Sequence, residues 1–173
     1  MLQAVAKDRG LQTLVLRAED FFGGKGTGSW FDLAITSQFR LGNVVYPGDR
    51  DLSHAWAYLP DLSRAFVALV ERRTECAKYE EFLFEGYSLT GDQLHELLEK
   101  ASNKKLKKAA IPWTFFRLDS LFNAVWRETL EMRYLWDRPH QLDGSKLTAF
   151  CPELMATPQK IAFEEALKDL KLL

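Results

Sequence analysis

The chain has 173 residues, of which 47% are hydrophobic and 27% charged, and its net charge is −1. A chain of this length is expected to form one domain, residues 1–173, around its own core. The near-zero net charge argues against nucleic acid and an anionic membrane surface as partners. The two cysteines are far apart, and neither a signal peptide nor an apolar run of about 18 residues is present, so we expect a cytoplasmic protein without a membrane span.

The first part of the chain predicts strands and helices in alternation. Residues 1–9 are typical of the end of a helix, and the apolar run at 11–16 predicts a strand buried on both faces, as in a parallel sheet. A glycine-rich loop follows at 17–29, then a helix over about 30–39 and a short strand at 43–46. This alternation is typical of α/β proteins.

The same alternation continues beyond residue 53. A strand is predicted at 54–59, and Asp61 is a suitable cap for the helix that follows it. The core-facing stripe of that helix is expected to consist of Leu62, Phe66, Val67 and Val70. A strand at about 81–86 then precedes a second helix, which the capping-box spacing of Thr90 and Gln93 predicts.

The last third of the chain predicts one more strand and several helices. An edge strand follows the basic run KKLKK and ends before Pro112, aromatic-rich helices are expected within 113–136, and a last helix begins with Pro158 at its first position. Acidic residues elsewhere offset the basic run, which indicates a solvated edge. Charged residues interrupt 113–136, so core packing or a hydrophobic lid is favoured there over membrane contact. The whole order predicts an α/β fold with a partly parallel sheet.

Few residues form a catalytic or ligand-binding motif. The glycines at 23–28 fit neither GxxxxGK[ST] nor GxGxxG, although their amides are able to hold an anion at a helix N-terminus; a connecting loop is the simpler interpretation. The three histidines, His54, His95 and His140, have no ligand spacing, so the sequence predicts no metal site. No nucleophile elbow is present.

Three segments resemble a known family. LVLRAEDFFGG at 14–24 resembles the LRxxNxYGP strand and loop of the extended short-chain dehydrogenases, which include NAD-dependent epimerases and dehydratases. The stretch 44–71 resembles the family segment with a short strand, an R-D-x-x-Y-V-x-D core and a helix, and 82–98 resembles its strand and capped helix. These three segments and a TPxxxAFEEAL-like C-terminus follow one another in the family order and cover almost the whole chain. Each segment alone is a weak indication of the family, whereas the set in this order is fairly specific.

The resemblance implies the C-terminal portion of a Rossmann-like fold with the small substrate-binding lobe. Asp20 stands where the family has a substrate-contacting Asn, and His54 stands where sugar-nucleotide members have an Arg that grips a diphosphate. Both departures disfavour a nucleotide-sugar substrate. The implied cofactor contacts are Arg17 and Gly23. The implied substrate site is walled by Asp20, Phe21, Phe22, Trp30, Tyr46, His54 and Trp56.

Several parts of the family are missing from this sequence. The first strand, its GxxGxxG motif, the ribose-binding acid and the catalytic Tyr–Lys pair are absent. None of the five tyrosines has a Lys four residues on, and although Tyr46 has Arg50 there, Pro47-Gly48 excludes a helix between them. We therefore expect no catalytic residue in this chain, and we expect the implied cofactor, NAD or NADP, not to bind this chain alone.

These observations favour a truncated, substrate-binding C-terminal part of an NAD(P)-dependent epimerase/dehydratase or reductase-like protein. It is expected to act on a small-molecule substrate together with an N-terminal half from another chain. The alternative is a non-enzymatic module from the same family, either ligand-sensing or self-associating. A truncated sheet leaves the strand at 11–16 with an unpaired edge, which favours self-association into a homo-oligomer.

Overall fold

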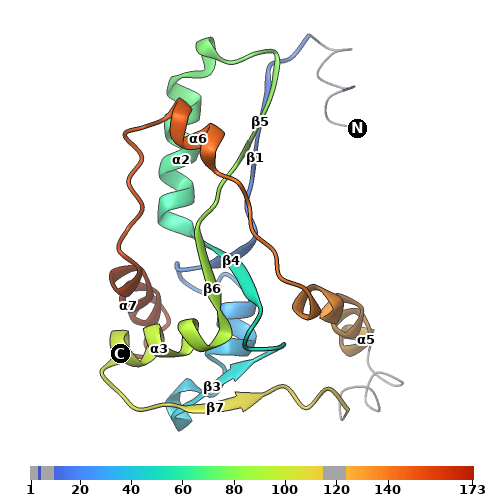
Figure 1. The fold of residues 1–173 in the computed structure, drawn as a ribbon, viewed down its shortest axis with the longest axis vertical. Helices are drawn as coiled ribbons and strands as arrows, with labels where there is room; N and C mark the ends of the chain where they lie inside the picture. The colour runs from blue at the N-terminus through green and yellow to red at the C-terminus, as the bar shows by residue number, and fades with distance from the viewer. Residues whose placement is uncertain (1–3, 5–9, 115–123) are drawn as a thin grey trace.

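The structure is a computed structural model that describes residue 4 and residues 10–114 and 124–173. Figure 1 shows an elongated arrangement, with a strand pair and two helices at one end and the C-terminus at the other. Apart from residue 4, the expected helix at 1–9 lies outside the described residues, and so does the middle of the expected helices at 113–136. The organisation as a single domain stays a prediction.

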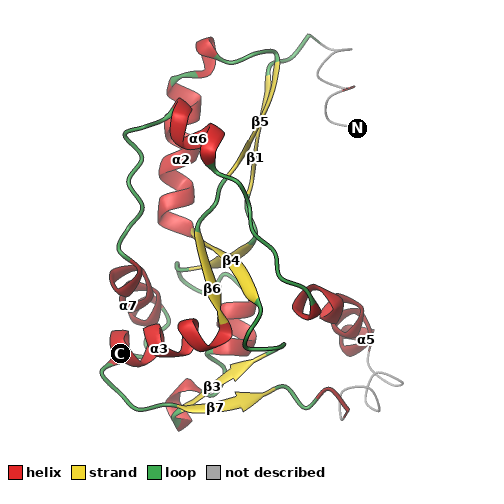
Figure 2. Cartoon of the chain, in the orientation of Figure 1, coloured by secondary structure: helices red, strands yellow, loops and turns green. Residues whose placement is uncertain are grey.

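The described strands form three small sheets, and most of their pairings are parallel (Figure 2). β1 (Thr13–Arg17) pairs in parallel with β5 (Tyr79–Leu83). β4 (Ser53–Tyr58) pairs in parallel with β2 (Asp20–Phe22) and antiparallel with β6 (Tyr87–Thr90). β3 (Asn43–Tyr46) pairs in parallel with β7 (Lys107–Ala110). The predicted α/β class with parallel strands is therefore confirmed.

β1 is a strand as predicted, but it is not buried on both faces. Leu14 and Leu16 pack towards the core that contains Phe82. On the other face Arg17 forms an exposed ion pair with Glu81 at 2.7 Å. Since β5 is the only strand paired with β1 in the described part of the chain, the outer edge of β1 has no partner there.

The strand expected at 81–86 ends early, because residues 84–86 are not part of a strand and a second strand follows them. β5 ends at Leu83, and β6 begins at Tyr87 after Gly86, which has φ of +63°. A side chain at position 86 would collide with the backbone carbonyl of Trp56. The break lets the chain leave β1 and pair with β4, which the apolar pattern alone did not reveal.

The expected helix at 30–39 is replaced by two short turns. η1 (Phe31–Ile35) is a π-helical turn, and η2 (Phe39–Leu41) is a 3₁₀ turn. The backbone amide and hydroxyl of Thr36 both donate to the carbonyl of Phe31, at 3.0 and 2.9 Å. These two hydrogen bonds to a residue five positions back widen the turn and prevent a regular α-helix.

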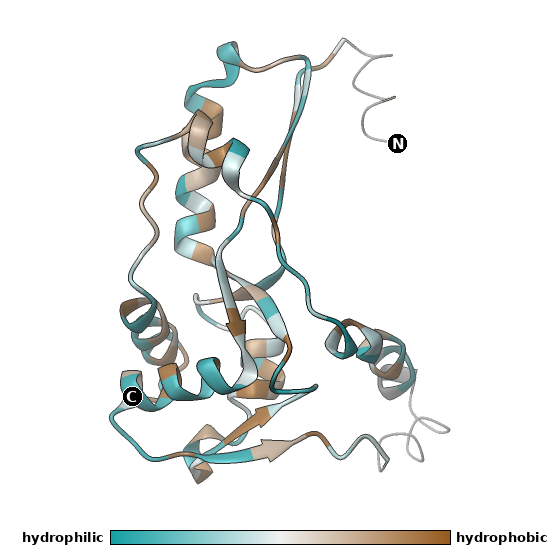
Figure 3. Cartoon of the chain, in the orientation of Figure 1, coloured by the Kyte–Doolittle hydropathy of each residue, from teal (hydrophilic) through white to brown (hydrophobic). Residues whose placement is uncertain are grey.

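α2 (Leu59–Glu71) begins before Asp61, so Asp61 is not its cap. Tyr58 occupies the cap position, and Pro60 in the first turn favours this earlier start. The Asp61 carboxylate instead accepts a hydrogen bond from the Thr157 amide at 2.8 Å. The predicted apolar stripe is also only partly buried, because Leu62 faces the core whereas three members are about half exposed: Phe66, Val67 and Val70. Helix α2 accordingly shows apolar and polar residues in close alternation in Figure 3.

α3 (Gly91–Ser102) has the predicted capping box. The Gln93 amide donates to Thr90 Oγ1 at 3.2 Å, and the Thr90 amide donates to Gln93 Oε1 at 2.9 Å. α3 packs on α7 (Gln159–Asp169), where Pro158 is the cap residue rather than the first helical one. The remaining helices are η3 (Arg73–Glu75), α5 (Ala124–Glu131), η4 (Met132–Asp137) and α6 (Ser145–Phe150).

Two clusters of buried side chains hold these elements together. The larger one joins the β2–β4–β6 sheet to α3 and α7, and the smaller one lies between α2, β5 and α6. No helix among the described residues is long and apolar enough to cross a membrane.

Candidate functional site

The imidazole rings of His54 and His140 meet although 86 residues separate them in the sequence. Nδ1 of His54 lies 2.7 Å from Nε2 of His140. The segment that contains His140 is held beside β4, because its amide donates to the Ser53 carbonyl at 3.0 Å and the Ala55 amide donates to His140 Nδ1 at 3.5 Å. The absence of ligand spacing in the sequence therefore did not prevent two histidines from forming a pair.

Two acidic side chains lie next to the histidine pair. Asp20 on β2 is opposite Trp56 of β4 in the sheet register, and His54 lies two residues before Trp56 on the same face of the sheet. Its Oδ2 atom is 4.0 Å from Nε2 of His140, and a Glu19 oxygen is 3.7 Å from the other ring nitrogen of His140. His54 is fully buried, whereas the side chains of Asp20 and His140 retain 22% and 24% of their exposure.

Trp136 of η4 fills the centre of the predicted substrate pocket. Its ring stacks on His54 with the centroids 4.8 Å apart, and only 1% of the residue is exposed. It meets the edges of Trp30 at 5.4 Å and Tyr46 at 5.5 Å, and lies 6.1 Å from Trp56. Four predicted pocket residues thus surround one indole ring, which supports the core-packing interpretation of this aromatic segment.

Gly48 permits this close approach of η4. A Cβ atom at position 48 would collide with the carbonyl and Cβ atoms of Trp136. The Pro47-Gly48 turn is therefore required where β3 leads into the site. Sequence reasoning did not identify Trp136 or His140, because neither belongs to a local motif.

Burial changes the pKa of two groups in opposite directions. Burial, assisted by the Glu19 carboxylate, raises the pKa of Asp20 to about 6. Burial, assisted by His140, lowers the pKa of His54 to about 4. At neutral pH the His54 ring is consequently neutral, and Asp20 is a buried anion.

Several buried polar atoms in this region have no hydrogen-bond partner among the described residues. They are the Tyr46 hydroxyl, His54 Nε2, Trp56 Nε1 and Trp136 Nε1. Buried polar atoms are normally paired, and four unpaired ones around one pair of histidines are unusual. The arrangement is chemically suited to binding a polar molecule or an ion.

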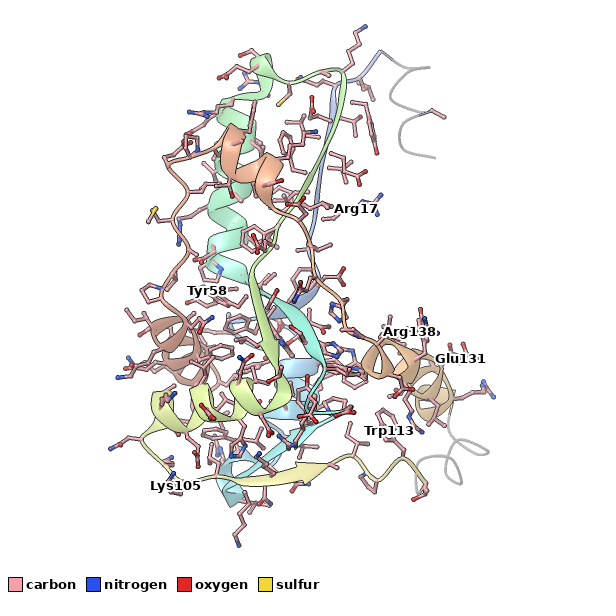
Figure 4. The ribbon with its side chains drawn as sticks, viewed as in Figure 1. Arg17, Tyr58, Lys105, Trp113, Glu131 and Arg138 are labelled. Atoms are coloured by element: carbon pink, nitrogen blue, oxygen red, sulfur yellow. The ribbon has the colours of Figure 1, made fainter. Side chains whose placement is uncertain are left out.

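The other predicted site residues lie elsewhere. Phe21 is 42% exposed and faces the opposite side of β2 from Asp20, while Phe22 is buried and stacks on Phe163 with centroids 4.4 Å apart. Arg17, labelled in Figure 4, projects from β1 beside Glu81. Gly23 has φ of +86° and lies under the Tyr58 ring.

The glycine-rich loop does not fit the diphosphate of NAD(P). The Gly24 amide donates to the Asp169 carboxylate at 3.1 Å, and the Gly28 amide donates to Asp32 at 3.2 Å. These carboxylates take the place that a phosphate would need and repel a second anion. The anion-binding alternative for this loop is therefore not supported, and contacts of Arg17 and Gly23 with a cofactor stay predictions.

A separate cavity of about 140 Å³ lies between α2 and α6. Its lining includes Asp61, Arg64 and Tyr87, and none of the predicted substrate residues. Asp61 there anchors the segment before α7, since it also accepts the Thr157 hydroxyl at 2.6 Å. The satisfied hydrogen bonds of Asp61 indicate a structural role.

No family model matches this sequence, and no curated protein matches it. Solved structures do match in fold. UDP-glucuronic acid 4-epimerase from Bacillus cereus in complex with NAD is 15% identical with a TM-score of 0.71, over 98% of this chain and 48% of its own. RMD from Pseudomonas aeruginosa complexed with NADPH is 16% identical with a TM-score of 0.66, over 96% and 50%. The chain thus spans about half the length of the NAD-dependent epimerases that it resembles in structure.

Proposed function

We propose that this chain is the substrate-facing, C-terminal part of an NAD(P)-dependent sugar epimerase- or reductase-like protein. The observation that carries the proposal is the match of 98% of the chain to only 48% of the Bacillus cereus epimerase. The family-like segments at 14–24 and 44–71 add support, because they contribute Asp20 and His54 to one site.

In this proposal the redox chemistry belongs to groups outside this chain. The glycine-loop amides are already paired with carboxylates, and the sequence holds no Tyr–Lys pair. NAD(P) is therefore bound by a nucleotide-binding part in another segment or chain. Among the described residues the β1–β5 sheet has an edge without a partner strand, and the nucleotide-binding part is proposed to extend it.

The substrate is proposed to be a small polar molecule without a nucleotide diphosphate. His54 is neutral and buried, so it lacks the permanent charge and the two parallel donors of an Arg. Asp20 adds negative charge in the same place, which disfavours an anionic substrate group. Binding also requires Trp136 to move, because this side chain occupies the centre of the pocket.

The sequence of the transcript upstream of the Met1 codon tests the proposal. We expect it, or an adjacent reading frame, to encode a strand, a GxxGxxG turn, a helix and a Tyr–Lys pair one helical turn apart. The proposal would be contradicted if the upstream sequence is untranslated and no neighbouring reading frame encodes these elements.

A self-associating, non-enzymatic module is the second candidate. It is favoured by the edge of β1, which has no partner strand in the part of the chain that the structure describes, and by the half-exposed apolar residues of α2, which are Phe66, Val67 and Val70. Light scattering across a concentration series distinguishes the two, because a stable homo-oligomer of this chain alone supports the module and a monomer at high concentration counts against it. The ligand-sensing alternative stays a prediction.

A further inference from the structure

Asp20, His54 and His140 carry donor atoms of kinds that bind metals, and one donor atom from each residue lies within 4.8 Å of the other two. We propose that these three side chains bind a divalent first-row transition-metal ion, with Zn²⁺ as the expected occupant. Asp20 and His54 also belong to the substrate site of the proposed function, but metal binding needs only residues of this chain and is tested without a substrate or a nucleotide-binding part.

The donor atoms are close to the spacing that a tetrahedral ion needs. Metal–ligand bonds of about 2.0–2.1 Å place neighbouring donors about 3.3 Å apart. The two imidazole nitrogens are 2.7 Å apart, and His140 Nε2 is 4.0 Å from Asp20 Oδ2. All three donor atoms lie within 4.8 Å of one another, so a change of at most about 1.5 Å in any separation brings them to the required value.

The chemistry of the donors selects the class of ion. Two imidazole nitrogens and one carboxylate oxygen suit Zn²⁺ and similar ions, whereas Mg²⁺ and Ca²⁺ prefer oxygen ligands. Three protein ligands leave a fourth tetrahedral position for water or a substrate oxygen. Because Asp20 and His140 are partly exposed and His54 is fully buried, an ion can reach the site from solvent on one side.

The surroundings support the ligand geometry. Metal binding through Nε2 of His140 requires the ring proton to be on Nδ1, which lies 3.7 Å from the Glu19 carboxylate. In that tautomer Nδ1 turns to the carboxylate and no longer accepts from the Ala55 amide at 3.5 Å, and a carboxylate partner of this kind orients a ligating ring and raises its basicity. Trp136 stacks on His54 and fixes that ring as well.

The charge of Asp20 favours a cation at this site. In the described part of the chain its carboxylate has no hydrogen-bond donor and no Lys or Arg partner, and its one charged-type contact is His140 Nε2 at 4.0 Å, which is an ion pair only when His140 is protonated. A buried carboxylate without a partner is costly. A dication coordinated by Asp20 removes that cost.

The test is a titration of the untagged full chain, freed of metal by EDTA and dialysis, with ZnCl2 against a chromophoric chelator. We expect one equivalent to bind, and the Asp20→Asn and His140→Ala variants to bind at least about 100-fold more weakly. Glu19→Gln should weaken binding about 10-fold. CoCl2 should give the intense visible bands of a four-coordinate site, and MgCl2 should not compete.

His95→Gln is the matched control, because His95 is equally a buried histidine but lies on α3 outside the group. It should bind Zn²⁺ like the wild type. Far-UV circular dichroism identifies folded variants, and His140→Gln replaces His140→Ala if the latter unfolds. The proposal is overturned if the wild type binds no stoichiometric Zn²⁺, or if the folded Asp20 and His140 variants bind it as tightly as the wild type.

Discussion

Replacement of Asp20 by Asn should make the metal-free protein more stable at neutral pH. The carboxyl group has a pKa of about 6 in the folded chain against an ordinary value of 3.8. Each unit of difference corresponds to about 1.4 kcal/mol, which gives an upper value of about 3 kcal/mol. Because 22% of the side chain is exposed, we expect a gain of about 2 kcal/mol for Asp20→Asn.

The sign follows from proton linkage. Between pH 3.8 and about 6 the folded state binds more protons at Asp20 than the unfolded state, so its contribution to stability falls as pH rises. The stabilising effect of Asp20→Asn should therefore be full above pH 6 and nearly absent at pH 4. The neutral amide has nearly the same shape, so packing is preserved.

Urea unfolding in EDTA at pH 4.0 and pH 7.5 measures this difference. Asp51→Asn serves as the control, because Asp51 is exposed and its replacement should change stability by less than about 0.5 kcal/mol. Equal stability of the Asp20→Asn variant and the wild type at pH 7.5 would refute the reasoning. A loss of stability there would show that Asp20 has a favourable partner.

Three further predictions concern the same fold. Trp136→Ala should lower the free energy of unfolding by about 3–5 kcal/mol in urea titrations, since it empties the centre of the aromatic cluster; Trp136→Phe should cost less. By NMR, His54 should titrate near pH 4, and His140→Ala should raise that pKa because His140 contributes to lowering it. As pH falls from 6.5 to 4, His54 therefore removes stability. Thr90→Ala should cost about 1 kcal/mol through loss of the α3 cap, and an unchanged unfolding midpoint would contradict the capping assignment.

Local patterns predicted the parts of the fold that local chemistry decides. The strand at 43–46 ends before a Pro-Gly turn, and the Thr90–Gln93 box begins α3, as expected. The start of α2 was wrong because a cap was assigned to Asp61 from its residue type, whereas Pro60 allows an earlier start. The division between β5 and β6 depends on the contact of Gly86 with the Trp56 carbonyl, which no nearby residue reveals.

The candidate site was predictable only in part. The family resemblance pointed to Asp20, Tyr46 and His54, which the structure brings to one region. His140 and Trp136 come from a segment without periodicity, and only tertiary packing brings them to β4. Sequence motifs for metal sites rely on the spacing of ligands within one helix or loop. Asp20, His54 and His140 lie on three separate segments, so no such motif could reveal them.

The fluorescence titration of NADPH with this chain, alone and together with the nucleotide-binding part that the proposal expects, tests the proposed function most directly. We expect no change in NADPH fluorescence with the chain alone, and saturable enhancement once both parts are combined. Saturable binding to the chain alone, or none to the combined parts, would contradict the account.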